Sequence, residues 1–243
     1  MWRGWAGSSR RSGPLRRGKL PAMSIRIAVA IESTAKRTFA CAVDWPGLAR
    51  SGKTESAALQ ALAACLQRYA IVARSAGEDF QGAGLELDVV ETGEGNASTE
   101  FGVPGRVTDA DRRPTSAADA GRLTRLVAAA WSRLDEVAAA APESLRKGPR
   151  GGGRDTLKIV EHALMADHAY AREMGLRLSA PTPDDRWSID QLREAMLAVL
   201  RQPSDGSPLA DRKWTARYAA HRIAWHALHH AWEIEDRSAP AEG

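Results

Sequence analysis

The sequence is poor in cysteine and contains no long apolar run. Its 243 residues include only two cysteines, Cys41 and Cys65, which excludes a disulfide scaffold and a zinc fold built on thiolates. No apolar stretch approaches the roughly 20 residues that a membrane helix needs, so we expect no membrane partner. The two cysteines fit a reducing compartment, so we expect a cytoplasmic protein. The composition, with 44% hydrophobic and 26% charged residues, is that of an ordinary globular chain.

Acidic residues are absent from the N-terminal stretch. Residues 1–22 carry several arginines and a lysine but no aspartate or glutamate, whereas the whole chain has a net charge of only +4. The stretch is rich in glycine and serine and shows no hydrophobic periodicity, so we predict a disordered basic tail over residues 1–23. Because the pI of 9.3 comes mostly from this tail, it argues little for a nucleic-acid partner, and we expect none.

Residues 24–92 have the pattern of strands around a helical segment. Hydrophobic residues alternate with polar or small ones over 25–32 and over 39–45, and the short link between them favours an antiparallel hairpin. Helical spacing predicts a helix over 55–73, and alternation predicts a third strand over 85–91. We therefore expect an α+β chain that opens with a small ββαβ domain, followed by a Gly- and Pro-rich linker over 93–117.

One stretch of this domain fits a phosphate-binding pattern, although the predicted strands argue against nucleotide binding. The stretch GLARSGKT (47–54) fits the P-loop pattern, but P-loop strands lie in parallel sheets, whose neighbouring strands need long crossovers. The antiparallel hairpin predicted here argues against nucleotide binding. Instead, FACAVDWPGLARSGKTESAALQALAACL resembles HicB-like antitoxin domains, over about residues 24–92. The resemblance implies a protein-binding module, with a protein partner bound through residues 24–92.

The rest of the chain has the pattern of a helical bundle. Amphipathic spacing predicts helices over 118–140, 155–175, 188–201 and 212–237. Four helices of this length, joined by short polar segments, predict an all-α four-helix bundle over residues 118–238.

Histidine is concentrated in this bundle, where all six histidines of the chain lie. His226 and His230 are four residues apart, so on a helix both imidazoles can reach one divalent metal. A third ligand has to come from another helix, and the segment 155–175 offers His162 and His168. These two point about 120° apart, and His162 lies on the more apolar side. The alternative is that the histidines are core residues or lie on a solvated helix end.

Two segments resemble a known family of metal-binding bundles. LKIVEHALMADHAYAREMGL and RYAAHRIAWHALHHAWEIEDR are similar to helices two and four of the DinB-like four-helix bundles, over about residues 115–238. In that family one histidine of helix two and an H-x-x-x-H pair of the last helix bind a divalent metal, usually zinc or nickel. Carried over, the ligands are His162, His226 and His230. Many members continue with Arg-Gly-Gln, whereas Ala231-Trp232-Glu233 follows here, which leaves the substrate subgroup open.

The DinB-like resemblance implies an activity as well as a metal site. Relatives use low-molecular-weight thiols, so it implies a metal-dependent S-transferase or isomerase acting on a small electrophilic substrate; such bundles also often form homodimers. Glu161 and Glu233 are candidate carboxylates for orienting the ligand imidazoles. The alternative function is a HicB-like antitoxin or regulatory module whose bundle is not catalytic.

Overall fold

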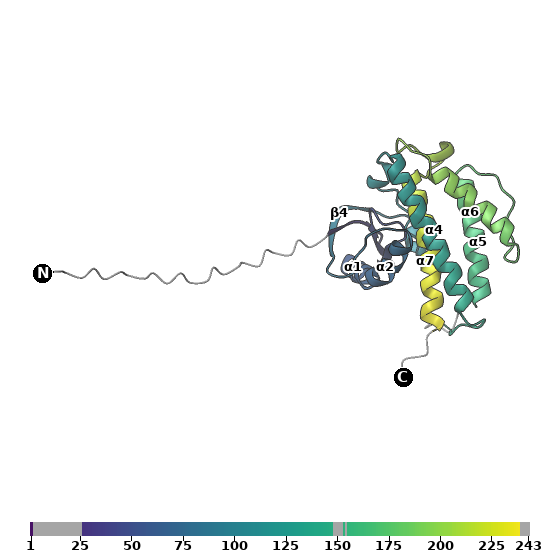
Figure 1. Cartoon of the computed structure of the whole chain (residues 1–243), viewed down its shortest axis with the longest axis horizontal. Coiled ribbons are helices and arrows are strands. Elements are labelled where there is room, and N and C mark those ends of the chain that lie inside the picture. Colours follow the sequence, from purple (N-terminus) through teal and green to yellow (C-terminus); the bar gives the residue numbers. More distant parts are fainter. Residues whose placement is uncertain (2–25, 148–152, 154, 239–243) are drawn as a thin grey trace.

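The computed structural model describes Met1, residues 26–147, Gly153 and residues 155–238. The tail predicted over residues 1–23 lies outside the described residues, apart from Met1. The described chain is a mixed α+β structure, with the sheet in its N-terminal part and long helices in its C-terminal part (Figure 1). The predicted α+β class is therefore confirmed.

The N-terminal part contains a four-stranded sheet in the order β3-β2-β1-β4. β1 and β2 form the predicted antiparallel hairpin, β2 and β3 are also antiparallel, and β4 runs parallel to β1. The ββαβ prediction missed β3, because this strand has four residues and no hydrophobic alternation. The strands are β1 (Arg26–Ser33), β2 (Thr38–Ala42), β3 (Ala49–Gly52) and β4 (Glu86–Glu94).

The helix predicted over 55–73 is instead a bent pair. α1 (Glu55–Ala64) begins at Thr54, whose side chain accepts a hydrogen bond from the amide of Ala57, and α2 (Leu66–Ser75) leaves it at an angle of 51°. Neither glycine nor proline marks the break at Cys65, so the sequence carries no breaker signal there. No single helix among the described residues is long and apolar enough to cross a membrane, although α1 and α2 together have that length and composition.

The segment 93–117, expected as a linker, is tied closely to the sheet. It contains α3 (Ala97–Phe101) and a 3₁₀ turn, η1 (Ala110–Arg112). The buried carboxylate of Glu32 on β1 accepts hydrogen bonds from the amides of Gly105 and Arg106 and from the hydroxyl of Thr99. Burial raises the pKa of Glu32, and these donors oppose that effect.

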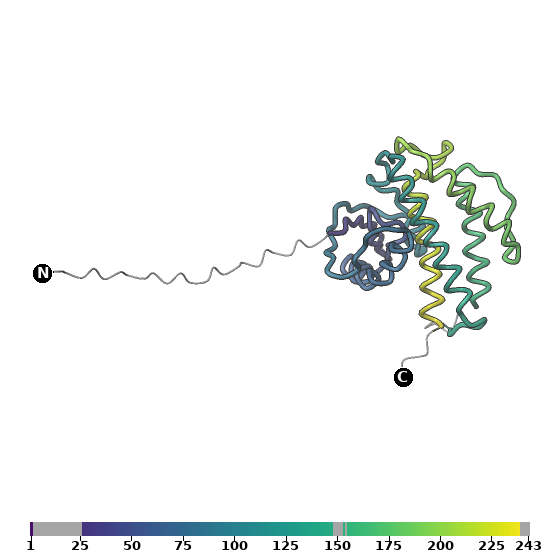
Figure 2. Tube along the Cα trace, viewed as in Figure 1, coloured from purple at the N-terminus to yellow at the C-terminus, as the bar shows by residue number. Residues whose placement is uncertain are grey.

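Four long helices form the bundle that the sequence predicts, with ends within a few residues of the expected ones. Ser116 and Asp119 form a capping box at the start of α4, and Gly175, with a φ of 85°, follows the end of α5. Around the bundle α4 contacts α7 and α6, and α5 contacts the same two helices (Figure 2). The helices are α4 (Ala117–Ala140), α5 (Thr156–Glu173), α6 (Arg186–Leu200) and α7 (Ala216–Ser238).

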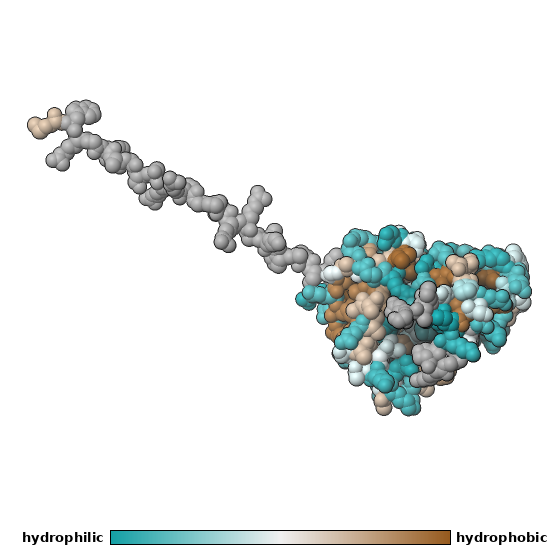
Figure 3. Space-filling model, turned by 90° about the horizontal axis from the view of Figure 1, so that it is seen from below, coloured by the Kyte–Doolittle hydropathy of each residue, from teal (hydrophilic) through white to brown (hydrophobic). Residues whose placement is uncertain are grey.

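The sheet part packs against the side of the bundle formed by α4 and α7 (Figure 1). The turn before β3 touches α7 directly: a Cβ added at Gly47 would lie 2.7 Å from Cδ1 of Leu228 and 3.2 Å from Cβ of Ala224. Arg122 of α4 reaches across to Glu78 at 2.8 Å. One hydrophobic cluster extends through both parts, and hydrophilic residues cover much of the face seen in Figure 3. The two parts thus share a core.

Candidate metal centre

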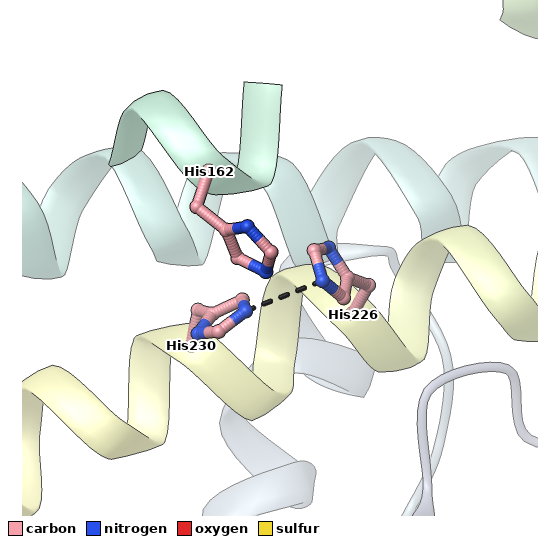
Figure 4. Close-up of side chains that lie close together, drawn as sticks. All are labelled: His162, His226 and His230. Carbon is pink, nitrogen blue, oxygen red and sulfur yellow. Dashed lines mark hydrogen bonds between the residues drawn. The ribbon is translucent and has the colours of Figure 1, made fainter. Parts of the chain in front are cut away.

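The structure brings His162, His226 and His230 together between α5 and α7 (Figure 4). One ring nitrogen of each histidine lies within 4.8 Å of the others. The ring centroids are 5.2 Å apart for His162 and His226, 5.0 Å for His162 and His230, and 4.6 Å for His226 and His230. We call these three residues the histidine trio.

The spacing of the α7 pair matches what one ion requires. Nε2 of His226 lies 3.2 Å from Nε2 of His230. Two imidazole nitrogens bound to one tetrahedral zinc at the usual bond length lie about 3.3 Å apart. His226 and His230 are buried and His162 is half-buried, so two ligands are held by packing and the third lies nearer to solvent.

Glu233 sets the orientation of one ligand. Nδ1 of His230 donates a hydrogen bond to Oε2 of Glu233 at 2.9 Å, and the other carboxylate oxygen accepts from Nη1 of Arg237 at 3.1 Å. With its proton on Nδ1, His230 presents the lone pair of Nε2 to the trio. Nδ1 of His226, in contrast, is buried and has no hydrogen-bond partner among the described residues. The other candidate, Glu161, is exposed on α5.

The local electrostatics keep His226 neutral. Burial, followed by the neighbouring His230 and His162, lowers the pKa of His226 to about 2. A neutral imidazole has a lone pair available for a metal, whereas an imidazolium does not. The donor set of three imidazoles and no thiolate suits zinc, nickel and other borderline divalent ions. The residues present therefore fit the metal that the sequence predicts.

Of the other three histidines, His168 and His221 bond to backbone carbonyls, whereas His229 lies beside the trio and groups with His230 and Glu233, with ligand atoms within 4.8 Å of one another. His168 donates from Nε2 to the carbonyl of Leu178 at 2.9 Å, and His221 makes the same kind of bond to the carbonyl of Val43 at 3.0 Å. His229 is exposed and its ring stacks on Trp225, with centroids 5.1 Å apart. The structure therefore brings His162, and not His168, beside the pair on α7.

Two further groups on α5, of which Tyr170 contacts the trio, were not expected from the sequence. Tyr170 lies edge-on to His226 with ring centroids 5.7 Å apart, and burial raises the pKa of its hydroxyl. Asp167 on α5 is also buried, which raises the pKa of its carboxyl to about 7, against the opposing effect of Arg193. An acid on the apolar side of an amphipathic helix is the signal that marks such a residue.

A groove also lies on the side of α7 that faces the sheet, and no residue of the trio lines it. It has a volume of about 260 Å³ and lies between β2, β3 and α7, and Glu233 and His229 form part of its wall. Its remaining lining includes Arg37, Phe39, Arg50, Trp225 and Trp232. Sequence spacing could not predict this groove, because Arg37 and Arg50 lie far from α7 in the chain.

Comparison with known proteins adds no relative: no family model matches the chain, and no curated protein or solved structure matches it.

Proposed function

We propose that this chain is a divalent-metal-dependent enzyme of the DinB-like superfamily, with His162, His226 and His230 as the metal ligands. The observation that carries the proposal is the convergence of three imidazole nitrogens from two helices of a four-helix bundle. Their spacing fits one ion, and His230 is already oriented by Glu233. Zinc or nickel suits this donor set.

Three protein ligands leave a coordination position open, which is the arrangement of catalytic sites rather than structural ones. A divalent ion bound there lowers the pKa of a thiol or a water molecule that reaches it. We propose a thiol-dependent S-transferase or isomerase, in which a low-molecular-weight thiol attacks a small electrophile. The residues of this chain keep His226 neutral by burial and fix the Nε2 lone pair of His230 through Glu233.

A regulatory module that binds a protein through residues 24–92 is the competing function. The turn at Gly47 and the ring of Phe39 already pack on α7, against Leu228 and Trp225. These surfaces are therefore occupied within the chain. This packing supports a role for the sheet part in completing the bundle, and so supports the enzyme over a free antitoxin-like domain.

Metal analysis of the purified chain tests the proposal. We expect about one divalent ion per chain after reconstitution, and its loss in His162→Ala, His226→Ala and His230→Ala. His168→Ala is the matched control, because His168 lies on the same helix as His162 but bonds to the carbonyl of Leu178. Wild-type protein that stays metal-free after reconstitution, or trio variants that keep the ion, would rule the proposal out.

A further inference from the structure

A second group of candidate metal ligands lies on the other side of the His230 ring. His229, His230 and Glu233 each offer one ligand atom within 4.8 Å of the others, and they form one of two such groups among the described residues. His230 belongs to both groups: its Nε2 lies 3.2 Å from Nε2 of His226, whereas its Nδ1 lies 2.9 Å from Oε2 of Glu233. The two nitrogens of one ring thus face two separate sets of ligands. We call His229, Nδ1 of His230 and Glu233 the outer set.

The spacing of the outer set suits one small ion. Two ligand atoms bound to the same tetrahedral zinc lie about 3.3 Å apart, so the 2.9 Å between Nδ1 of His230 and Oε2 of Glu233 needs only a small widening. His229 closes the set from the preceding position of α7, with its ring centroid 5.1 Å from that of His230 and the two ring planes at 68°. Two imidazoles and one carboxylate form a donor set that zinc accepts.

The outer set is open to the groove between the sheet and α7. His229 and Glu233 both line this groove, whose volume is about 260 Å³. His229 is exposed and Glu233 is half-buried, whereas His230 is buried behind them. An ion that arrives from solvent therefore meets two of the three side chains before it reaches His230. The groove gives the outer set the entry path that a metal site requires.

The charges around the outer set make it the weaker of the two positions. Oε1 of Glu233 already accepts from Arg237 at 3.1 Å, so Oε2, which accepts from His230, is the oxygen left for an ion. Asp236, the other carboxylate on the groove wall, pairs with Arg68 at 2.8 Å, and Arg50 adds a positive charge to the same wall. Nearby guanidinium groups oppose a divalent cation, so we expect the trio to fill first.

We propose that a second divalent cation, such as zinc, binds between His229, Nδ1 of His230 and Oε2 of Glu233, so that the imidazole of His230 bridges two ions. The inner ion is the one held by the trio, so the bridge rests on the proposed function. The second ion takes the place of the proton on Nδ1, which leaves to solvent, and the ring becomes a bridging imidazolate. Nε2 keeps its direction toward the trio. Glu233 thus orients His230 through a proton when metal is scarce and through an ion when it is abundant.

Titration of the full-length chain with cobalt(II) tests the outer position. Equilibrium dialysis counts the bound ions, and we expect about one cobalt per chain at low concentration and a second that binds roughly a thousandfold more weakly. Electron paramagnetic resonance reports the bridge, because a shared imidazolate couples the spins of two cobalt ions into a pair that gives little signal. The signal should therefore rise with the first ion and fall with the second. In His229→Ala the second ion and the fall in signal should both be lost, while the first ion still binds.

Two further variants and the wild type separate this inference from the proposed function. His168→Ala removes a histidine that belongs to neither ligand set, so both binding steps should remain. His229→Asp restores a ligand oxygen and should return part of the second step, which a mere loss of the stacking on Trp225 would not do. Failure of the wild type to bind the first cobalt contradicts the proposed function. A first ion with no second, a second whose signal simply adds to the first, or a second that persists in His229→Ala overturns the outer position alone.

Discussion

Nδ1 of His230 lies 2.9 Å from Oε2 of Glu233, one helical turn further along α7. This bond lies on the far side of the ring from the histidine trio, so it fixes which nitrogen faces His162 and His226. His226 has no comparable partner among the described residues. The two α7 ligands therefore differ: one is oriented by a carboxylate and the other by packing alone.

Replacing that carboxylate should weaken metal binding without abolishing it. In Glu233→Gln the amide cannot stabilise the proton on Nδ1 of His230 as a carboxylate does, so we expect zinc affinity to fall roughly 10- to 100-fold. Competition with a chromophoric chelator measures this change. Glu161→Gln is the control, since Glu161 is exposed on α5, and it should leave the affinity unchanged. An equal effect of both substitutions would show that Glu233 has no special role.

Zinc should stabilise the folded chain through the trio. At a free concentration of about 100 times the dissociation constant, binding to the native state alone adds roughly 2.7 kcal/mol to the free energy of unfolding. We expect a matching rise in Tm for the wild type and for His168→Ala, and none for His226→Ala. Differential scanning fluorimetry with zinc and with a chelator measures it. A zinc-dependent rise that persists in His226→Ala would place the ion elsewhere.

Asp167 should make the stability depend on pH. Its carboxyl has a native pKa of about 7, above the ordinary value of 3.8, so the native state holds the proton more tightly than the unfolded chain. The tighter binding of this proton stabilises the native state fully below a pH of about 4. As the pH rises to about 7, the free energy of unfolding falls by at most roughly 4 kcal/mol. Relative to the wild type, Asp167→Asn should therefore gain stability as the pH rises through this range.

Urea unfolding at several pH values measures the Asp167 effect. The measurement uses the difference in unfolding free energy between the wild type and Asp167→Asn, because His226 acts in the opposite direction in both proteins. The pKa of His226 is lowered, so its contribution to stability grows as the pH rises to 6.5, the ordinary pKa of histidine. A difference in unfolding free energy that stays constant from pH 4 to pH 8 would contradict a raised pKa at Asp167.

Gly47 and Gly77 form a natural pair for testing how the sheet part meets α7. Both have a left-handed φ, of 90° and 75°, but a Cβ at Gly47 would meet Leu228 whereas one at Gly77 meets nothing within 4 Å. Gly77→Ala should cost about 1 kcal/mol of unfolding free energy from backbone strain. Gly47→Ala should cost about 3 kcal/mol, since overpacking is added. Equal costs in urea titrations would mean that the turn moves away from α7 freely.

The histidine trio could be predicted from the sequence because its geometry is mostly local. The i,i+4 spacing of His226 and His230 fixes their shared face, and helical position separates His162 from His168. The helices of the bundle were predicted for the same reason, since a repeat of apolar residues reports directly on a buried face. Only the meeting of α5 and α7 is non-local, and the resemblance to the DinB-like bundles, rather than spacing, joined His162 to the pair on α7.

Other features have no local signal. β3 owes its place to pairing with β2, since ARSG has no alternation of its own, and the break between α1 and α2 occurs without glycine or proline. The groove depends on bringing Arg37 and Arg50 against α7, which is a property of the packed molecule. The sequence predicts only a linker over residues 93–117. The hydrogen bonds that tie this segment to Glu32 come from backbone amides, which every residue except proline possesses, so they leave no signal in the sequence.

The hydrophobic cluster that runs from the sheet into the bundle has a consequence for how the chain unfolds. Residues such as Tyr69 of α2 and Leu126 of α4 belong to the same buried set, so neither part keeps its interior when the other is lost. We therefore expect one cooperative transition in calorimetry rather than two. Expressing residues 118–238 alone would expose the face of α7 that now covers Gly47.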